Sequence, residues 1–105
     1  GFNGVMDRFG QIEPKVLFCA DGYYYNGKTC DSLARIAEIA EQIDSLQRVV
    51  VVPLTKEAPD LAAISGAVLF DDYLDEGASE VTYAQLPFDH PLYIMYSSGT
   101  TGVPK

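Results

Sequence analysis

The sequence predicts an α/β fold built on a mainly parallel sheet with flanking helices. Two apolar runs, at 15–20 and 48–53, are continuous rather than alternating, which is typical of strands covered on both faces. Between them lies a helical pattern, so the three segments form a strand–helix–strand unit with parallel strands and a right-handed crossover. With 105 residues, 48% of them hydrophobic, the chain is long enough to bury a core.

A helix is expected near the start, from Gly4 to Ile12, because its apolar residues recur on one helical face. Pro14 ends it, since the residue before a proline is biased away from helical geometry. The first strand, Lys15–Ala20, follows and ends at Asp21. Parallel sheets bind ligands at the carboxyl ends of their strands, which makes Asp21 a candidate site residue, but turn chemistry is the favoured interpretation.

Three tyrosines at 23–25 precede Asn26-Gly27, a pair favoured in tight type I′ hairpin turns. The tyrosines could stack on a purine, but we expect the hairpin to pack over the edge of the core. The clearest helix follows, capped by Asp31 or Ser32 and running to about Ile43. Its apolar stripe consists of Leu33, Ile36, Ile39, Ala40 and Ile43.

A turn leads into the second strand, Arg48–Pro53, whose four successive valines require cover on both faces. A short helix is expected at Asp60–Ile64 and a third strand at Ala67–Phe70. Asp71-Asp72 end that strand and open a brief helical turn through Leu74. Adjacent acids at a strand end are compatible with a metal site, but the acids that follow favour a solvated rim, and no metal ligand is predicted.

The segment before the carboxyl end combines a connector with a strand. Residues 85–91 form the connector, which carries the only histidine, His90. A structural position is favoured for His90 over a role as catalytic base, because no nucleophile pattern accompanies it. Leu92–Tyr96 is apolar and aromatic throughout and is flanked by turn formers, which predicts a buried strand.

A hydroxyl- and glycine-rich loop that ends in lysine, Ser97–Lys105, follows this strand. Glycines let backbone N–H groups point at an anion, hydroxyls add donors, and the lysine adds a positive charge. These groups predict a phosphate-binding loop, with a flexible tail as the alternative. It is not a Walker A loop, because only two residues separate Gly99 from Gly102 and no Lys-Ser or Lys-Thr follows the second glycine.

The residue order Tyr-Ser-Ser-Gly-Thr-Thr-Gly-Val-Pro-Lys at 96–105 resembles the phosphate-binding signature of the adenylate-forming acyl-CoA synthetases. The runs 8–18 and 86–92 resemble the same family, and the resemblance is weakest at 56–85. The resemblance implies a ligase that uses ATP and magnesium to adenylate a short carboxylate and then transfers the acyl group to coenzyme A. The runs 8–18 and 86–92 resemble in particular a member that acts on acetoacetate. The residues implied to hold the ATP phosphates are Ser97, Ser98, Gly99, Thr100, Thr101, Gly102 and Lys105.

A loop of this kind is normally followed by a helix whose N-terminus helps to hold the phosphate. We therefore expect residues 1–105 to be a single α/β fragment of a larger N-terminal adenylation domain, continued after Lys105. By the resemblance, the adenine, acyl and coenzyme A pockets lie elsewhere, so this stretch is expected to carry no catalytic residue and to be inactive alone. Two alternatives remain: a synthetase for acetate, propionate or another acid, and a non-catalytic α/β interaction module.

Charge and cysteine content exclude several classes of protein. The net charge is -8 and no basic cluster interrupts the chain, so nucleic-acid binding is not predicted. Cys19 and Cys30, with a single histidine, suggest neither a zinc site nor a disulfide. There is no signal-peptide pattern, and no apolar run approaches about 18 residues, so no membrane span is predicted. A reducing, cytoplasmic setting is the expectation.

Overall fold

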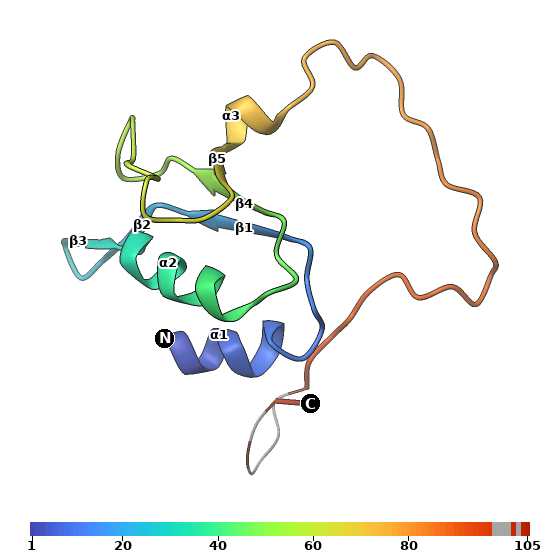
Figure 1. The fold of residues 1–105 in the computed structure, drawn as a ribbon, viewed down its shortest axis with the longest axis horizontal. Coiled ribbons are helices and arrows are strands. Elements are labelled where there is room, and N and C mark those ends of the chain that lie inside the picture. The colour runs from blue at the N-terminus through green and yellow to red at the C-terminus, as the bar shows by residue number, and fades with distance from the viewer. Residues whose placement is uncertain (98–101, 103) are drawn as a thin grey trace. The chain divides into compact units, whose positions relative to one another are not determined.

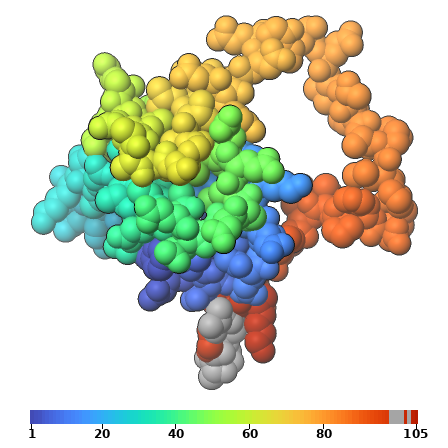
Figure 2. All heavy atoms as spheres, in the orientation of Figure 1, coloured from blue at the N-terminus to red at the C-terminus, as the bar shows by residue number. Residues whose placement is uncertain are grey.

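The computed structural model describes residues 1–97, 102, 104 and 105, and the chain divides into two units, 1–74 and 75–105. The first unit contains the helices and strands, and Figure 2 shows its side chains packed together. The described residues of the second unit form no helix or strand. In chain order the elements are α1 (Phe2–Phe9), β1 (Val16–Ala20), β2 (Gly22–Tyr25), β3 (Lys28–Asp31), α2 (Leu33–Gln42), β4 (Arg48–Val52), β5 (Ala67–Leu69) and α3 (Phe70–Tyr73) (Figure 1).

The central sheet has three strands in the order β1-β4-β5, and both pairings are parallel. Val16 lies opposite Arg48 and Ala20 opposite Val52, which confirms the predicted strand–helix–strand unit. β2 and β3 form a separate antiparallel hairpin. Its turn residues Asn26 and Gly27 have φ angles of 50° and 73°, the positive values that a type I′ turn requires, so the predicted hairpin is confirmed as well.

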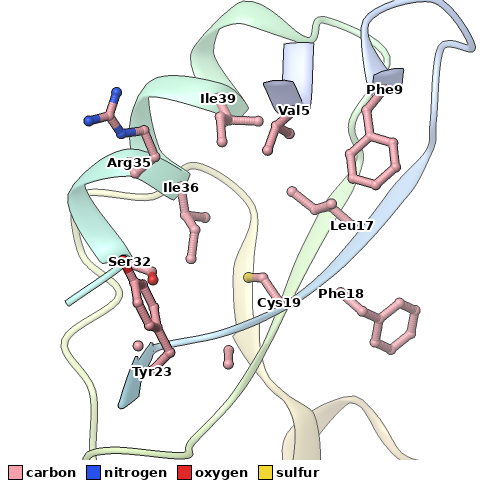
Figure 3. Close-up of a pocket in the computed structure, with 12 residues that line it drawn as sticks. Val5, Phe9, Leu17, Phe18, Cys19, Tyr23, Ser32, Arg35, Ile36 and Ile39 are labelled. Carbon is pink, nitrogen blue, oxygen red and sulfur yellow. The ribbon is translucent and has the colours of Figure 1, made fainter. Parts of the chain in front are cut away.

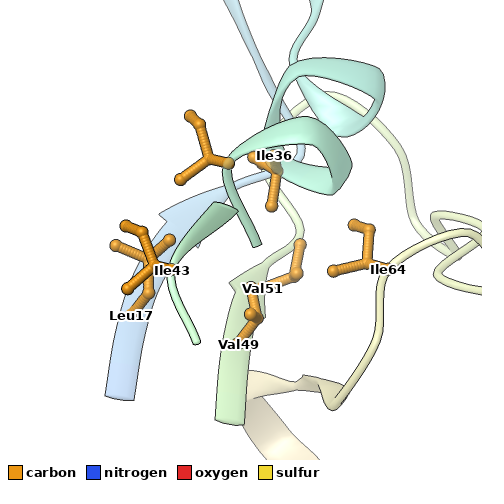
Figure 4. Packing of buried hydrophobic residues seen from close by; sticks show 7 residues of the cluster. Leu17, Ile36, Ile43, Val49, Val51 and Ile64 are labelled. Atoms are coloured by element: carbon orange, nitrogen blue, oxygen red, sulfur yellow. The ribbon is translucent and has the colours of Figure 1, made fainter. Parts of the chain in front are cut away.

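The hydrophobic core lies between α2 and one face of the sheet (Figure 4). The predicted apolar stripe of α2 faces this core: Ile36 and Ile39 are buried, and Leu33 and Ala40 are partly buried against it. α1 covers the same core with partly buried apolar side chains and has no fully buried residue. The buried cluster consists of Leu17, Ile36, Ile39, Ile43, Val49, Val51 and Ile64.

The other face of the sheet is covered less completely. Val50 is fully buried, whereas Phe18, its neighbour on β1, is 56% exposed. The Phe18 ring meets the Tyr73 ring of α3 edge-on, with 6.1 Å between the ring centroids. The central strand β4 is therefore buried on both faces as its valine run predicts, while the edge strand β1 is not.

Several predicted boundaries differ from the structure by one to three residues, and two predicted elements, at 60–64 and 92–96, are wrong. The first helix begins and ends earlier than expected, at Phe2–Phe9, and turns replace its last part. The short helix expected at Asp60–Ile64 is wrong, because this segment forms turns. The backbone bonds of this segment, from the Ile64 N–H to the Leu61 oxygen at 3.0 Å and from the Ala67 N–H to the Ile64 oxygen at 3.3 Å, span three residues each, so they close separate turns and not the turns of an α-helix.

The buried strand predicted at Leu92–Tyr96 is also wrong. These residues have no regular structure, and the side chains of Leu92 and Met95 are 79% and 86% exposed. A strand is stable only when a neighbour satisfies its backbone groups, and no strand pairs with this segment in the described part of the chain. The apolar residues predict that the segment prefers burial, but they do not show whether another strand lies beside it to form backbone hydrogen bonds.

Truncating the core side chain Ile39, which is 4% exposed, tests the packing against α2. Ile39→Ala is expected to lower the free energy of unfolding by about 2–5 kcal/mol, because it removes buried methyl groups and leaves a cavity. Leu54→Ala is the matched control, since the Leu54 side chain is 57% exposed. Urea unfolding of both variants measures the difference, and equal losses would contradict the core assignment.

Candidate functional site

The predicted phosphate loop is closed at its base. The Ser97 N–H donates to the Lys105 carbonyl oxygen at 3.0 Å, and the Ser97 hydroxyl donates to the same oxygen at 3.3 Å. Ser97, Gly102 and Lys105 are exposed. The structure therefore brings the first and last predicted site residues together. The predicted site residues Ser98, Gly99, Thr100 and Thr101 lie outside the described residues.

Gly102 adopts a backbone conformation that favours glycine. Its φ angle is 96°, and no heavy atom lies within 4 Å of the position that a Cβ would occupy. The requirement for glycine is thus conformational rather than a matter of crowding. An open backbone of this kind, in a loop that also carries hydroxyls and a lysine, is suited to phosphate oxygens.

The donor types of the loop fit a phosphate better than a metal ion. The hydroxyl, backbone N–H and ammonium groups are donors or cations, and phosphate oxygens accept from all three. Among residues 1–97, 102, 104 and 105, no cluster of three or more histidine, cysteine or acidic side chains could hold a metal. Asp71 and Asp72 are both exposed at the start of α3.

A second polar cluster lies where β1 and β4 end, the edge at which parallel sheets usually bind ligands. Asp21 is fully buried there. One carboxylate oxygen accepts from the N–H groups of Leu54 and Thr55 at 2.5 and 3.0 Å, and the other accepts from the Thr55 hydroxyl at 2.6 Å. Asp21 therefore ties the end of β1 to the chain that leaves β4, and its oxygens are occupied by internal partners.

The hydrogen bonds also decide the charge of Asp21. Burial is the largest single influence and raises the pKa of this carboxyl. The bonds from the Thr55 hydroxyl and from the Leu54 and Thr55 N–H groups together outweigh burial and lower the pKa to about 2. Asp21 is thus an ionised structural residue at neutral pH. Nothing in the sequence pattern pointed to its partners, which lie 33 and 34 residues away.

The hairpin is joined to the same region by an exposed ion pair. The Lys56 ammonium lies 2.7 Å from Asp31, whose other carboxylate oxygen accepts from the Leu33 N–H at 2.7 Å. The hydrogen bond from Lys56 lowers the pKa of Asp31, and the same bond raises the pKa of Lys56. Of the two predicted caps, Ser32 holds the N-cap position of α2 without a capping bond from its side chain, and the Asp31 carboxylate, one residue earlier, accepts from the Leu33 N–H instead.

An apolar pocket of about 320 Å³ opens beside β1, between α1 and α2 (Figure 3). Tyr23, Ser32 and Arg35 supply the polar part of its lining. Burial raises the pKa of the lining thiol Cys19 to about 11, so this cysteine stays protonated and unreactive. The remaining lining residues are Val5, Phe9, Leu17, Phe18, Ala20, Gly22, Ile36 and Ile39. Such a lining suits an apolar group and not a phosphate.

The three tyrosines of the hairpin are exposed, from 53% at Tyr23 to 73% at Tyr25.

The part of the chain that the structure describes has no helix long and apolar enough to cross a bilayer. Both cysteines, Cys19 and Cys30, are free.

Residues 4–105 match the family of AMP-binding enzymes, and the chain belongs to that family. Acetoacetyl-CoA synthetase of Mus musculus is 45% identical over 111 residues, which cover all of this chain and 16% of the mouse protein. Acetoacetyl-coenzyme A synthetase of Rhizobium meliloti (strain 1021) is 43% identical over 107 residues, again across the whole chain and 16% of that protein.

The structure of acetoacetyl-CoA synthetase from Streptomyces lividans matches with a TM-score of 0.81 and 44% identity, over 99% of this chain and 15% of that one. The predicted resemblance to acyl-CoA synthetases is thereby confirmed. The chain spans about 16% of the length of the curated relatives it matches.

Proposed function

We propose that this chain carries the ATP-phosphate loop of an acid–thiol ligase that makes acetoacetyl-CoA from acetoacetate, ATP and coenzyme A. The observation that carries the proposal is the loop at 97–105, which is closed at its base by the bonds between Ser97 and Lys105. Similarity to enzymes named for this reaction, across the whole chain, supports the choice of acid.

The proposed reaction has two steps. A carboxylate oxygen of the acid attacks the α-phosphorus of ATP, the bond to the β-phosphate oxygen breaks, and pyrophosphate leaves with the electron pair. The coenzyme A thiol, losing its proton, then attacks the carbonyl carbon of the acyl adenylate, and AMP leaves. The first step concentrates negative charge on the departing pyrophosphate, so donors fixed around its oxygens lower the barrier.

In this proposal the loop supplies those donors. The Lys105 ammonium offsets charge on the β- and γ-phosphates, the hydroxyls donate to their oxygens, and the glycines let the backbone approach. The residues assigned to this role are Ser97, Ser98, Gly99, Thr100, Thr101, Gly102 and Lys105. Magnesium would accompany ATP as its counter-ion, and no side chain of residues 1–105 is assigned to it.

We also propose that residues 1–105 belong to a larger N-terminal adenylation domain. This protein alone is expected to show no turnover, because the relatives use a chain several times longer. The two free cysteines support a reducing, cytoplasmic setting for the enzyme.

Turnover of the full-length enzyme with different acids tests the proposed substrate. With ATP and coenzyme A, acetoacetate is expected to give a kcat/KM at least ~10-fold above acetate, propionate and butyrate, because a pocket that hydrogen-bonds the 3-oxo group rejects acids that lack it. AMP and thioester formation are the readouts, with reactions lacking coenzyme A as the control. Preference for acetate or propionate would transfer the assignment to another acyl-CoA synthetase, and no AMP formation with any acid would overturn it.

A further inference from the structure

In the described part of the chain β1 pairs only with β4, so β1 lies at an edge of the parallel sheet. Just before β1, the Lys15 carbonyl accepts from the Gln47 and Arg48 N–H groups at the start of β4. Just after β1, the Asp21 N–H donates to the Val52 carbonyl at the end of β4. Backbone N–H and C=O directions repeat every second residue along a strand. The backbone groups of Val16, Phe18 and Ala20 therefore point away from β4, toward the open side of the sheet.

This edge lacks the features that keep edge strands from pairing with other chains. Edge strands are usually short, charged or interrupted by proline. β5, at the opposite edge, is only 3 residues long and passes directly into α3, which carries Asp71 and Asp72 in its first turn. β1 is a 5-residue strand, Val-Leu-Phe-Cys-Ala, without charge or proline. Of the two edges, β1 is the one built to be covered.

Apolar surface lies on both sides of this edge. On the helical side, the pocket of about 320 Å³ is lined by Leu17, Ile36 and Ile39 (Figure 3). On the opposite side, the Phe18 ring is 56% exposed. A strand added beside β1 would place alternate side chains in the pocket and next to Phe18, so it would need apolar residues on both faces.

We propose that the β1 edge is completed by a parallel β-strand, apolar on both faces, from the part of the enzyme outside residues 1–105. These residues account for 16% of the length of the relatives, so most of such an enzyme is available to supply the strand. The parallel direction follows from the two existing pairings, since sheets of one kind are favoured. A second copy is a poorer occupant, because each copy carries a net charge of -8. The proposal does not depend on which acid the enzyme activates.

Amide hydrogen exchange at single-residue resolution tests the proposal without any substitution. The amides of Phe18 and Ala20 are expected to exchange at least ~100-fold more slowly in the full-length enzyme than in the 105-residue protein. The amides of Leu17 and Cys19, which face β4, serve as internal controls and are expected to be protected in both. Equal exchange rates for the Phe18 and Ala20 amides in the two proteins would overturn the proposal. Protection of these amides that rises with the concentration of the short protein would also overturn it, because the strand beside β1 would then come from a second copy.

A pair of proline variants gives an independent readout. Ala20→Pro removes an N–H that points to the open side, whereas Cys19→Pro removes one that faces β4. Cys19→Pro is expected to lower the thermal midpoint of both the short protein and the full-length enzyme. Ala20→Pro is expected to lower the thermal midpoint by several degrees more in the full-length enzyme than in the short protein. A decrease that is no larger in the full-length enzyme would contradict the added strand.

Discussion

Lys105→Ala in the full-length enzyme is expected to reduce acetoacetate-dependent exchange of pyrophosphate into ATP by ~100-fold. The ammonium is the only full positive charge that the loop 97–105 offers to the departing pyrophosphate. Its removal leaves hydroxyl and N–H donors, which offset less charge. Lys28→Ala is the matched control, because Lys28 is an exposed lysine of the hairpin strand β3. Unchanged exchange in Lys105→Ala would remove this lysine from the mechanism.

The backbone requirement of the loop is tested by a second matched pair. Gly102→Ala and Gly27→Ala introduce the same methyl group at φ angles of 96° and 73°, and neither Cβ would meet an atom within 4 Å. Each substitution carries a backbone strain of about 1–2 kcal/mol. Only Gly102→Ala is expected to lower exchange, by ~10-fold or more, because only Gly102 lies in the segment that we propose to hold the phosphates. Equal activities of the two variants would show that the shape of the loop is unimportant.

Asp21→Ala is expected to be strongly destabilising, with a loss of about 2–4 kcal/mol in the free energy of unfolding, comparable to that of Ile39→Ala. It leaves the N–H groups of Leu54 and Thr55 without the carboxylate that accepts from them. Asp31→Ala, which removes an exposed carboxylate paired with Lys56, is the control and is expected to cost much less. Similar losses in the two variants, measured by urea unfolding, would contradict the role of Asp21.

Acid should expose the same interaction in the unmodified protein. The pKa of Asp21 in the folded state is lowered to about 2, below its ordinary value near 4 in an unfolded chain. The stabilisation from this group is therefore fully present above about pH 4 and is lost as the pH falls toward about 2. Asp21→Asn, which cannot titrate, should show a weaker decline over that range. An identical acid profile for both proteins would assign the decline to other carboxyl groups.

Local patterns in the sequence predicted most of the first unit correctly. The strands at the apolar runs 15–20 and 48–53, the stripe of α2 and the Asn26-Gly27 turn each depend on neighbouring residues and are confirmed, whereas cover on both faces holds for β4 and not for β1. The tie from Asp21 to Thr55 depends on contacts between residues 34 apart, which no local pattern encodes. The expected helix at 60–64 is wrong because the backbone there closes separate three-residue turns, as in the bond from the Ile64 N–H to the Leu61 oxygen. The expected strand at 92–96 failed because apolar residues alone do not provide a pairing neighbour.

The candidate site was predicted from residue order rather than from any fold rule. Hydroxyls, glycines and a lysine after an apolar run suit either a phosphate loop or a flexible tail, and the order of residues 96–105 favours the phosphate loop. The structure adds the closed base between Ser97 and Lys105 and the positive φ of Gly102. The assignments of all seven loop residues to the ATP phosphates stay predictions, and four of these residues, Ser98, Gly99, Thr100 and Thr101, lie outside the described part of the chain.

A crystal structure of the full-length enzyme with a non-hydrolysable ATP analogue tests the central claim most directly. The proposal predicts β- and γ-phosphate oxygens within hydrogen-bonding distance, about 2.7–3.2 Å, of the Lys105 ammonium and of hydroxyl or N–H donors in the loop 97–102. Triphosphate density placed against another part of the enzyme, with the loop making no contact to it, would contradict the assignment of this segment as the ATP-phosphate site.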